Sequence, residues 1–547
     1  MTLERSVRTS LHRGACTLLL LSCCVPTMAA EMARPSYDVE GKGIAALSHD
    51  LAGGRVTAVA LVQAYRARIA SIDRGGPTLQ AVVALNPDVE AEAAASDRLR
   101  QGGAAPRALE GIPILIKDNI ETADAMATTA GSLALAANMT RRDAPLVARL
   151  RAAGALILGK TNLSEWANFR SSASISGWSG VGGLTRNPFA LDRSACGSSS
   201  GSAVAVAASL APAAIGTETD GSITCPAAMS GLVGLKPTVG LVSRTHVVPI
   251  SATQDTPGPI THDVGDAALL LSVIAGADPA DAATAQADAH HPDVAATRDA
   301  EALRGRRIGV LRFLAGHNEA TDAVFARALD RLHAAGATLV ELRDGPDMDA
   351  IGAAEMTVML TEFKAGLDAY LATTPDTVQA RSLAAVIAFN ETHRDRELVL
   401  FGQDLMRKAQ ATAGLDDPGY RSALAYARRA AGTEGLDRLL SHDQLDALVA
   451  PTGGPAWVVD LINGDHDTGS ASTLPAVAGY PHLTVPMGEV DGMPVGLSFI
   501  GPAWSEQLLL GFATAYEARA QQRPRPRYLP TLELSTRQRD MLSPVRN

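Results

Sequence analysis

The chain has 547 residues, of which 46% are hydrophobic, which is enough for a large buried core and excludes an intrinsically disordered protein. Its formal net charge of −10 argues against a nucleic-acid partner, because phosphate binding needs clustered cations. Lysine is rare, with six residues against 42 arginines, so a lysine that follows an apolar run stands out.

Residues 1–30 have the pattern of a secretory signal peptide. Basic residues, an apolar run and small residues follow one another in that order: Arg5, Arg8, Arg13, residues 16–25, Ala29 and Ala30. The apolar run is too short to span a membrane as a helix. The pattern predicts a periplasmic or secreted bacterial protein. The segment 20–23 also resembles a lipoprotein cleavage box, which would make Cys23 a lipid anchor.

Helices and strands are predicted to alternate in the region that follows. The spacing of apolar residues predicts helices over 43–52 and 57–73, the second with Thr57 as its N-cap. Residues 79–86 form a candidate strand, and an Ala- and Glu-rich helix is expected from Asp88 onward. This alternation is typical of βα units.

The next elements bring chemically interesting residues to the ends of strands. The apolar segment 111–116 is predicted to be a buried strand that ends at Lys117. Residues 144–162 have the pattern of a helix, a glycine stop and a strand. After a serine-rich loop, a helix near 202–209 and a strand near 213–216 are expected.

The second half is predicted to complete one sheet. Four segments have strand patterns: 307–311, 337–342, 446–450 and 482–501, the last with a turn at Asp491-Gly492. A helix is expected over 319–335, residues 350–440 are mostly helical by pattern, and 279–303 has the composition of a surface excursion. These elements predict an α/β fold with one large mixed β-sheet covered by helices on both faces.

Several kinds of hydrolytic site are absent from the sequence. There is no H-E-x-x-H or C-x-x-C motif, which argues against a catalytic zinc, and there is no S-x-x-K motif. The serine-rich segment 196–227 contains no histidine. We therefore expect no catalytic metal, and a hydroxyl in this segment needs another base.

One alternative is an α/β-hydrolase esterase. Residues 197–201 match the nucleophile-elbow motif G-x-S-x-G with Ser199 at its centre. That motif requires a strand directly before it, whereas 185–196 contains Pro188 and scattered charges. The available downstream histidine, His482, lies within a predicted strand rather than on a loop.

Seven segments occur in one order along the chain: GIPILIKDNI (111–120), TTAGSLAL (128–135), GKTNLSEWANF (159–169), GGLTRNP (182–188), CGSSSGSAVAVAA (196–208), GTETDGSITCPAAMSGLVGLKPT (216–238) and GYPHLTVPMG (479–488). Together they resemble the amidase signature family of serine hydrolases, over residues 38 to 530. The segments TETDGSI, CGSSSGS and 401–420 are most similar to bacterial peptide amidases. The resemblance implies a single amidase signature domain over 31–547.

The resemblance also implies an activity: hydrolysis of amides without a cofactor or an obligate protein partner, with release of ammonia from C-terminal peptide amides. By the same resemblance, Ser222 is the nucleophile, Ser198 the bridging serine after a cis peptide bond, and Lys117 the terminal base. The chemistry is consistent, because burial of a lysine favours its neutral form, which can accept a proton. Ser198 can then relay the proton of Ser222, which forms the acyl-enzyme.

The resemblance further implies an oxyanion hole of four backbone N–H groups, from Thr219, Asp220, Gly221 and Ser222. Asp220 stands where the wider family has glycine, so its carboxylate must point away from the developing charge or bind a donor of the substrate. Ser199 is expected to form hydrogen bonds within this network. Gln254, with Asp255, either closes one side of the site or belongs to a structural loop.

Three questions stay open at this point. Cys196 and Cys225 could form a disulfide in an oxidising compartment or remain two buried thiols. The same chemistry could act on amino-acid, aryl or fatty amides, because specificity depends on loops whose shape the sequence does not show. A non-catalytic peptide-binding relative is a further alternative, which the intact Lys117 and Ser222 disfavour.

Overall fold

A mixed sheet of eleven strands runs through the computed structural model, which describes residues 37–520 and 523–533. The strand order is β1-β3-β2-β6-β8-β7-β12-β13-β11-β9-β10. The strands have these bounds: β1 (Val82–Leu85), β2 (Pro113–Lys117), β3 (Leu156–Thr161), β6 (Ala213–Glu218), β7 (Val233–Lys236), β8 (Thr256–Thr261), β9 (Arg307–Leu311), β10 (Thr338–Leu342), β11 (Ala447–Pro451), β12 (His482–Val490) and β13 (Met493–Ile500). The predicted signal peptide and Cys23 lie outside the described residues.

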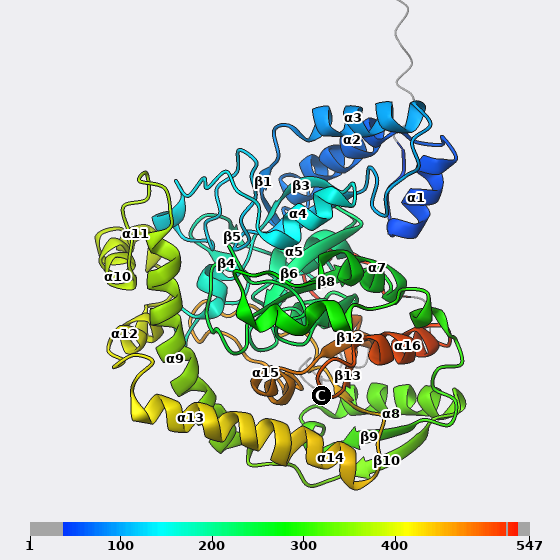
Figure 1. The fold of residues 1–547 in the computed structure, drawn as a ribbon, viewed down its shortest axis with the longest axis vertical. Helices are drawn as coiled ribbons and strands as arrows, with labels where there is room; N and C mark the ends of the chain where they lie inside the picture. Colours follow the sequence, from blue (N-terminus) through cyan, green and yellow to red (C-terminus); the bar gives the residue numbers. More distant parts are fainter. Residues whose placement is uncertain (1–36, 521–522, 534–547) are drawn as a thin grey trace, which may run out of the picture. The chain divides into compact units, whose positions relative to one another are not determined.

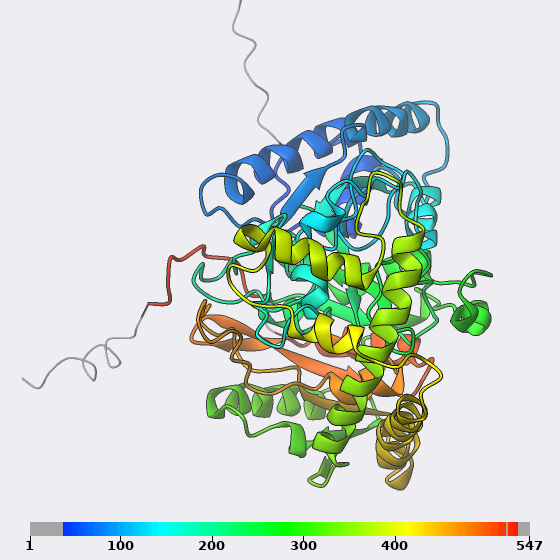
Figure 2. The same cartoon turned by 90° about the vertical axis from the view of Figure 1, so that its left-hand side faces the viewer.

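Helices cover the sheet on both faces, which confirms the predicted α/β architecture (Figure 1). Their bounds are α1 (Ile44–Ala52), α2 (Ala58–Arg68), α3 (Val89–Gln101), α4 (Pro145–Ala152), α5 (Ser200–Ala207), α6 (Thr224–Met229), α7 (Val264–Ile274), α8 (Glu319–Ala334), α9 (Met348–Ala372), α10 (Leu383–Thr392), α11 (Arg394–Glu397), α12 (Asp404–Gln410), α13 (Pro418–Arg428), α14 (Asp437–His442), α15 (Thr473–Ala478) and α16 (Glu506–Glu517). In Figure 2 the orange strands β12 and β13 lie beside the green helix α8, which packs on them.

Most local predictions agree with these elements. Thr57 caps α2, because its side chain accepts a hydrogen bond from Ala60 N at 3.1 Å. The helix predicted over 57–73 continues after Arg68 as a π-helical turn over Ile69–Asp73. The predicted hairpin is formed by β12 and β13, with positive φ at both Asp491 and Gly492.

Two central strands, β7 and β8, were not predicted from the sequence. Strand β8 contains Pro257 and Pro259, and prolines normally argue against a central strand because they lack the N–H that a ladder needs. Nevertheless β8 lies between β6 and β7 and pairs antiparallel with both. Pairing with neighbours on two sides therefore overrides the local signal.

The helices α9 to α14 form a long excursion, coloured yellow-green to yellow in Figure 1. A hydrophobic cluster that includes Phe363 and Leu367 of α9 joins this excursion to Trp166 and Phe169 of the core. The ring centroids of Phe169 and Phe363 are 5.1 Å apart. This packing places α9 beside the loop that precedes β8. No helix in the described residues has the length and apolarity that a membrane crossing requires.

Candidate active site

Lys117 is held at the end of β2 by three hydrogen-bonding contacts. Strand β2 runs parallel to β3 on one side and β6 on the other, so its last residue lies at the edge where β6 also ends. Lys117 Nζ lies 2.8 Å from Ser198 Oγ, 2.9 Å from Thr217 Oγ1 and 3.1 Å from Thr217 O. Both Lys117 and Ser198 are fully buried.

The burial of Lys117 changes its protonation. Removal from water lowers the pKa of the amine to about 7, while Glu218 and Asp255 act in the opposite direction by favouring the charged form. No carboxylate forms a salt bridge with Lys117 within the described part of the chain. A lysine in this state can accept a proton near neutral pH, which is the property that a general base needs.

The structure brings the two serine-containing segments together. The peptide bond between Gly197 and Ser198 is cis, as the family resemblance implied. Ser199 N donates to Ser222 O at 3.0 Å, so the chain just after Ser198 lies against the chain at Ser222. Cys196 and Cys225 form a disulfide, which answers the question that the sequence left open and joins the same two segments by a covalent bond.

Ser199 occupies a supporting position. Its hydroxyl donates to Thr217 O at 3.0 Å and accepts from Thr217 N at 3.3 Å, and the side chain is fully buried. His482 does not reach it, because its Nε2 lies 2.6 Å from Ser498 Oγ, and His482 is the first residue of β12 rather than an interior one. The geometry of a nucleophile elbow with a histidine partner is therefore absent at Ser199.

The segment from Thr219 to Ser222 presents unused backbone donors. Among the described residues, the N–H groups of these four positions donate no hydrogen bond to another protein atom. Gly221 has φ +77°, a left-handed conformation that glycine adopts without a steric penalty. Ser222 is slightly exposed, with 7% of its surface accessible. A row of free N–H groups beside an accessible hydroxyl can stabilise a developing oxyanion.

Glu218 orders this segment, and sequence reasoning missed it. Its buried carboxylate accepts hydrogen bonds from Ile223 N at 2.7 Å and Thr224 N at 2.9 Å. Lys236, at the end of β7, stabilises the charge of Glu218, and burial lowers the pKa of Lys236 to about 8. The available signal was Lys236 itself, another of the six lysines in an apolar run.

Asp220 points toward two helices. Its Oδ2 accepts a hydrogen bond from Thr473 Oγ1, at the start of α15, at 2.9 Å. Glu355, on α9, lies near this segment, because Gln254 Nε2 contacts both Thr219 O and the Glu355 carboxylate. Gln254 Nε2 donates to Glu355 Oε1 at 2.7 Å, so Gln254 contacts this network. Burial and the charge of Asp220 raise the pKa of Glu355 to about 9.

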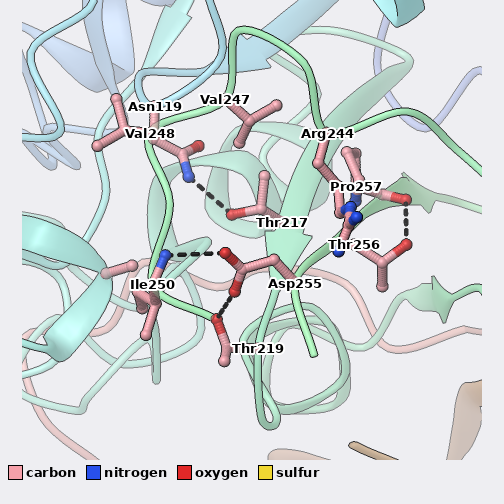
Figure 3. A pocket seen from close by; sticks show the side chains of 11 residues that line it. Asn119, Thr217, Thr219, Arg244, Val247, Val248, Ile250, Asp255, Thr256 and Pro257 are labelled. Atoms are coloured by element: carbon pink, nitrogen blue, oxygen red, sulfur yellow. Dashed lines mark hydrogen bonds between the residues drawn. The ribbon is translucent and has the colours of Figure 1, made fainter. Parts of the chain in front are cut away.

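A small cavity adjoins the Lys117 contacts (Figure 3). In this view Asn119 points at Thr217, to whose Oγ1 its Nδ2 donates at 2.9 Å, and Asp255 bridges Ile250 N and Thr219 Oγ1 at 2.8 and 2.6 Å. The cavity thus reaches the hydroxyl group that contacts Lys117. Asp255 belongs to the wall of this cavity.

Comparisons with known proteins agree with this geometry. The Amidase family model matches residues 60–510. A probable amidase of Arabidopsis thaliana is 38% identical over 487 residues, covering 87% of this chain and 89% of that protein.

Two solved structures of peptide amidases are similar as well. The native peptide amidase from Stenotrophomonas maltophilia is 53% identical with a TM-score of 0.84, covering 89% of this chain and 98% of that one. A peptide amidase in complex with the competitive inhibitor chymostatin is 52% identical with a TM-score of 0.85, covering 90% of this chain and 99% of that one. The chain belongs to the amidase signature family and is an amide hydrolase.

Proposed function

We propose that the enzyme hydrolyses amides through an acyl-enzyme on Ser222, with Ser198 as proton relay and Lys117 as base. The observation that carries this proposal is the 2.8 Å contact between Lys117 Nζ and Ser198 Oγ in a fully buried setting. The backbone contact between Ser199 and Ser222 supports it, since the bridging serine then lies beside the nucleophile segment. A lysine that burial makes neutral replaces the histidine that the site lacks.

The proposed cycle begins with neutral Lys117 accepting the proton of Ser198 while Ser198 accepts that of Ser222. Ser222 Oγ attacks the carbonyl carbon, and the free N–H groups of Thr219–Ser222 stabilise the resulting oxyanion. The proton on Lys117 returns through Ser198 to the nitrogen of the substrate, so that the C–N bond breaks and ammonia leaves. Water then attacks the ester of Ser222 by the same relay and releases the acid.

As substrates we propose peptides that carry a C-terminal carboxamide. The support is the similarity to two solved peptide amidase structures over almost their whole length, together with Asp220 at the position where the wider family has glycine. The arginine-rich, apolar and small-residue pattern of residues 1–30 further leads us to propose an exported enzyme.

The test is ammonia release by the mature protein from a blocked dipeptide amide, with Ser222→Ala as the control. We expect release by the wild type and a loss of at least a thousandfold in the variant. A fluorophosphonate probe followed by peptide mapping should modify Ser222. Modification of Ser199 instead would overturn the assignment of the nucleophile. Activity only on amino-acid, aryl or fatty amides would overturn the proposed substrate and leave the mechanism standing.

A further inference from the structure

Two acidic side chains meet beside the segment that we assign to the oxyanion. Asp220 belongs to that segment, and Glu355 comes from α9, 135 positions further along the chain. Glu355 is buried, with 5% of its surface accessible. Gln254 Nε2 lies 2.7 Å from Glu355 Oε1 and 3.5 Å from Thr219 O, so Glu355 lies beside the residue that precedes Asp220. Two carboxylates close together in a site largely shielded from water do not both remain ionised, because their repulsion is poorly screened there.

An unsatisfied oxygen shows where a proton is needed. Asp220 Oδ2 accepts from Thr473 Oγ1, but Asp220 Oδ1 is buried and has no donor among the described groups. A buried acceptor without a donor costs about 1–3 kcal/mol. A protonated Glu355 supplies that donor, since an un-ionised carboxyl group carries one O–H.

The hydrogen bonds around the pair place the proton on Glu355. Thr473 Oγ1 donates to Asp220 Oδ2 at 2.9 Å, which stabilises the ionised form of Asp220. Glu355 receives a hydrogen bond from Gln254 Nε2 on Oε1, which leaves its other oxygen to carry the proton. Asp220, the more exposed of the two, therefore holds the negative charge. Glu355, which is buried on α9, stays neutral.

We propose that Glu355 is a positioning residue, which in its protonated form donates to Asp220 and holds the Asp220 carboxylate away from the oxyanion formed at Ser222. The inference rests on the function proposed above, since it assumes an oxyanion bound by the Thr219–Ser222 segment. When Glu355 ionises, repulsion displaces Asp220, and its negative charge opposes the oxyanion. Turnover should then fall while substrate binding changes less.

The charged and titratable groups around the pair come from several elements. Lys236 of β7 and Glu218 of β6 both interact with Asp220. On α9 itself, Glu362 is engaged elsewhere, since Ser251 Oγ and Tyr420 Oη of α13 donate to it at 2.6 and 2.7 Å. The remaining groups on neighbouring elements pair away from Glu355: Asp255 with Thr219, Arg407 with Glu391, and Lys408 with Asp404.

The test is the pH dependence of kcat on a peptide amide between pH 6 and 10.5. In the wild type, kcat should fall on the alkaline side of about pH 9, the pKa of Glu355, by up to tenfold per pH unit. Glu355→Gln imitates the protonated acid, because its oxygen accepts from Gln254 and its NH₂ donates to Asp220. This variant should retain the turnover lost in Glu355→Ala and should lack the alkaline decline. Glu355→Ala should lower kcat at least tenfold with a smaller change in KM.

Glu362→Gln is the matched control on the same helix, and the pH midpoint of its alkaline decline should equal that of the wild type. An alkaline decline that persists unchanged in Glu355→Gln would overturn the inference and assign the decline to Lys236, whose pKa is about 8. Constant wild-type turnover up to pH 10.5, or a wild-type kcat in Glu355→Ala, would overturn it too. Failure of the function proposed above would show separately, as undiminished activity of Ser222→Ala.

Discussion

The most direct test of the proposed base is the protonation of Lys117. Burial lowers the pKa of this amine from 10.5 to about 7, so about half of the molecules carry a neutral Lys117 at pH 7, against about one in 3,000 at the ordinary value. In the proposed mechanism, the neutral form is the active one. Hence kcat/KM should decline below pH 7 by about tenfold per pH unit, with a single-proton slope.

The same shift makes a prediction about stability. The folded state binds fewer protons at Lys117 than the unfolded state between pH 7 and 10.5, so the folding penalty is full below pH 7 and disappears as pH rises to 10.5. With these two pKa values the penalty is about 5 kcal/mol at pH 6 and about 2 kcal/mol at pH 9. Lys117→Met removes it, at the expense of the contacts with Ser198 and Thr217.

The assay combines urea denaturation of wild type and Lys117→Met at pH 6 and pH 9 with ammonia release. The variant should be inactive. Its stability relative to the wild type, measured as the free energy of unfolding, should be about 3 kcal/mol greater at pH 6 than at pH 9. Lys160→Met is a suitable comparison, since Lys160 is also buried but contacts Ile120 and Thr128 rather than the serines. Wild-type turnover in Lys117→Met, or an acid decline centred near pH 4, would refute the argument.

Two further predictions concern the serine segments. The disulfide between Cys196 and Cys225 closes a loop with a sequence separation of 29. The double alanine variant should therefore lose about 3–4 kcal/mol of unfolding free energy in urea. An unchanged midpoint of urea denaturation would show that other contacts hold the two segments together. Gly221→Ala places a Cβ 3.0 Å from Ser472 Oγ at a residue with φ +77°. The substitution should cost about 1–2 kcal/mol of stability and lower kcat. Wild-type kinetics in this variant would show that Gly221 does not belong to the oxyanion segment.

Local sequence was sufficient for a large part of this protein. Alternating patterns predicted the βα units, and the apolar run before Lys117 predicted a buried strand with a lysine at its end, which is β2. The motif order pointed to Ser198 and Ser222 as candidate site residues, because a family pattern keeps residue types at fixed spacing. The predictions of helices and strands succeeded because periodicity and turn residues are properties of short segments.

Other features depended on residues that are distant in sequence. Strand β8 contains two prolines and forms only because β6 and β7 pair with it from both sides. The cysteines could be paired only once the fold placed them 6.0 Å apart, measured between Cα atoms. Glu218 and Glu355 carry no local sign of their roles.

The physical reason is that burial and contact decide the chemistry of an ionisable group. The pKa of Lys117 is lowered because the fold buries it, and the pKa of Glu355 is raised by burial and by the charge of Asp220. The amino-acid sequence by itself pointed to Lys117, Ser198 and Ser222 as the candidate reacting groups. Only the tertiary structure decided which of them are charged, because desolvation and long-range contacts arise when the chain is folded.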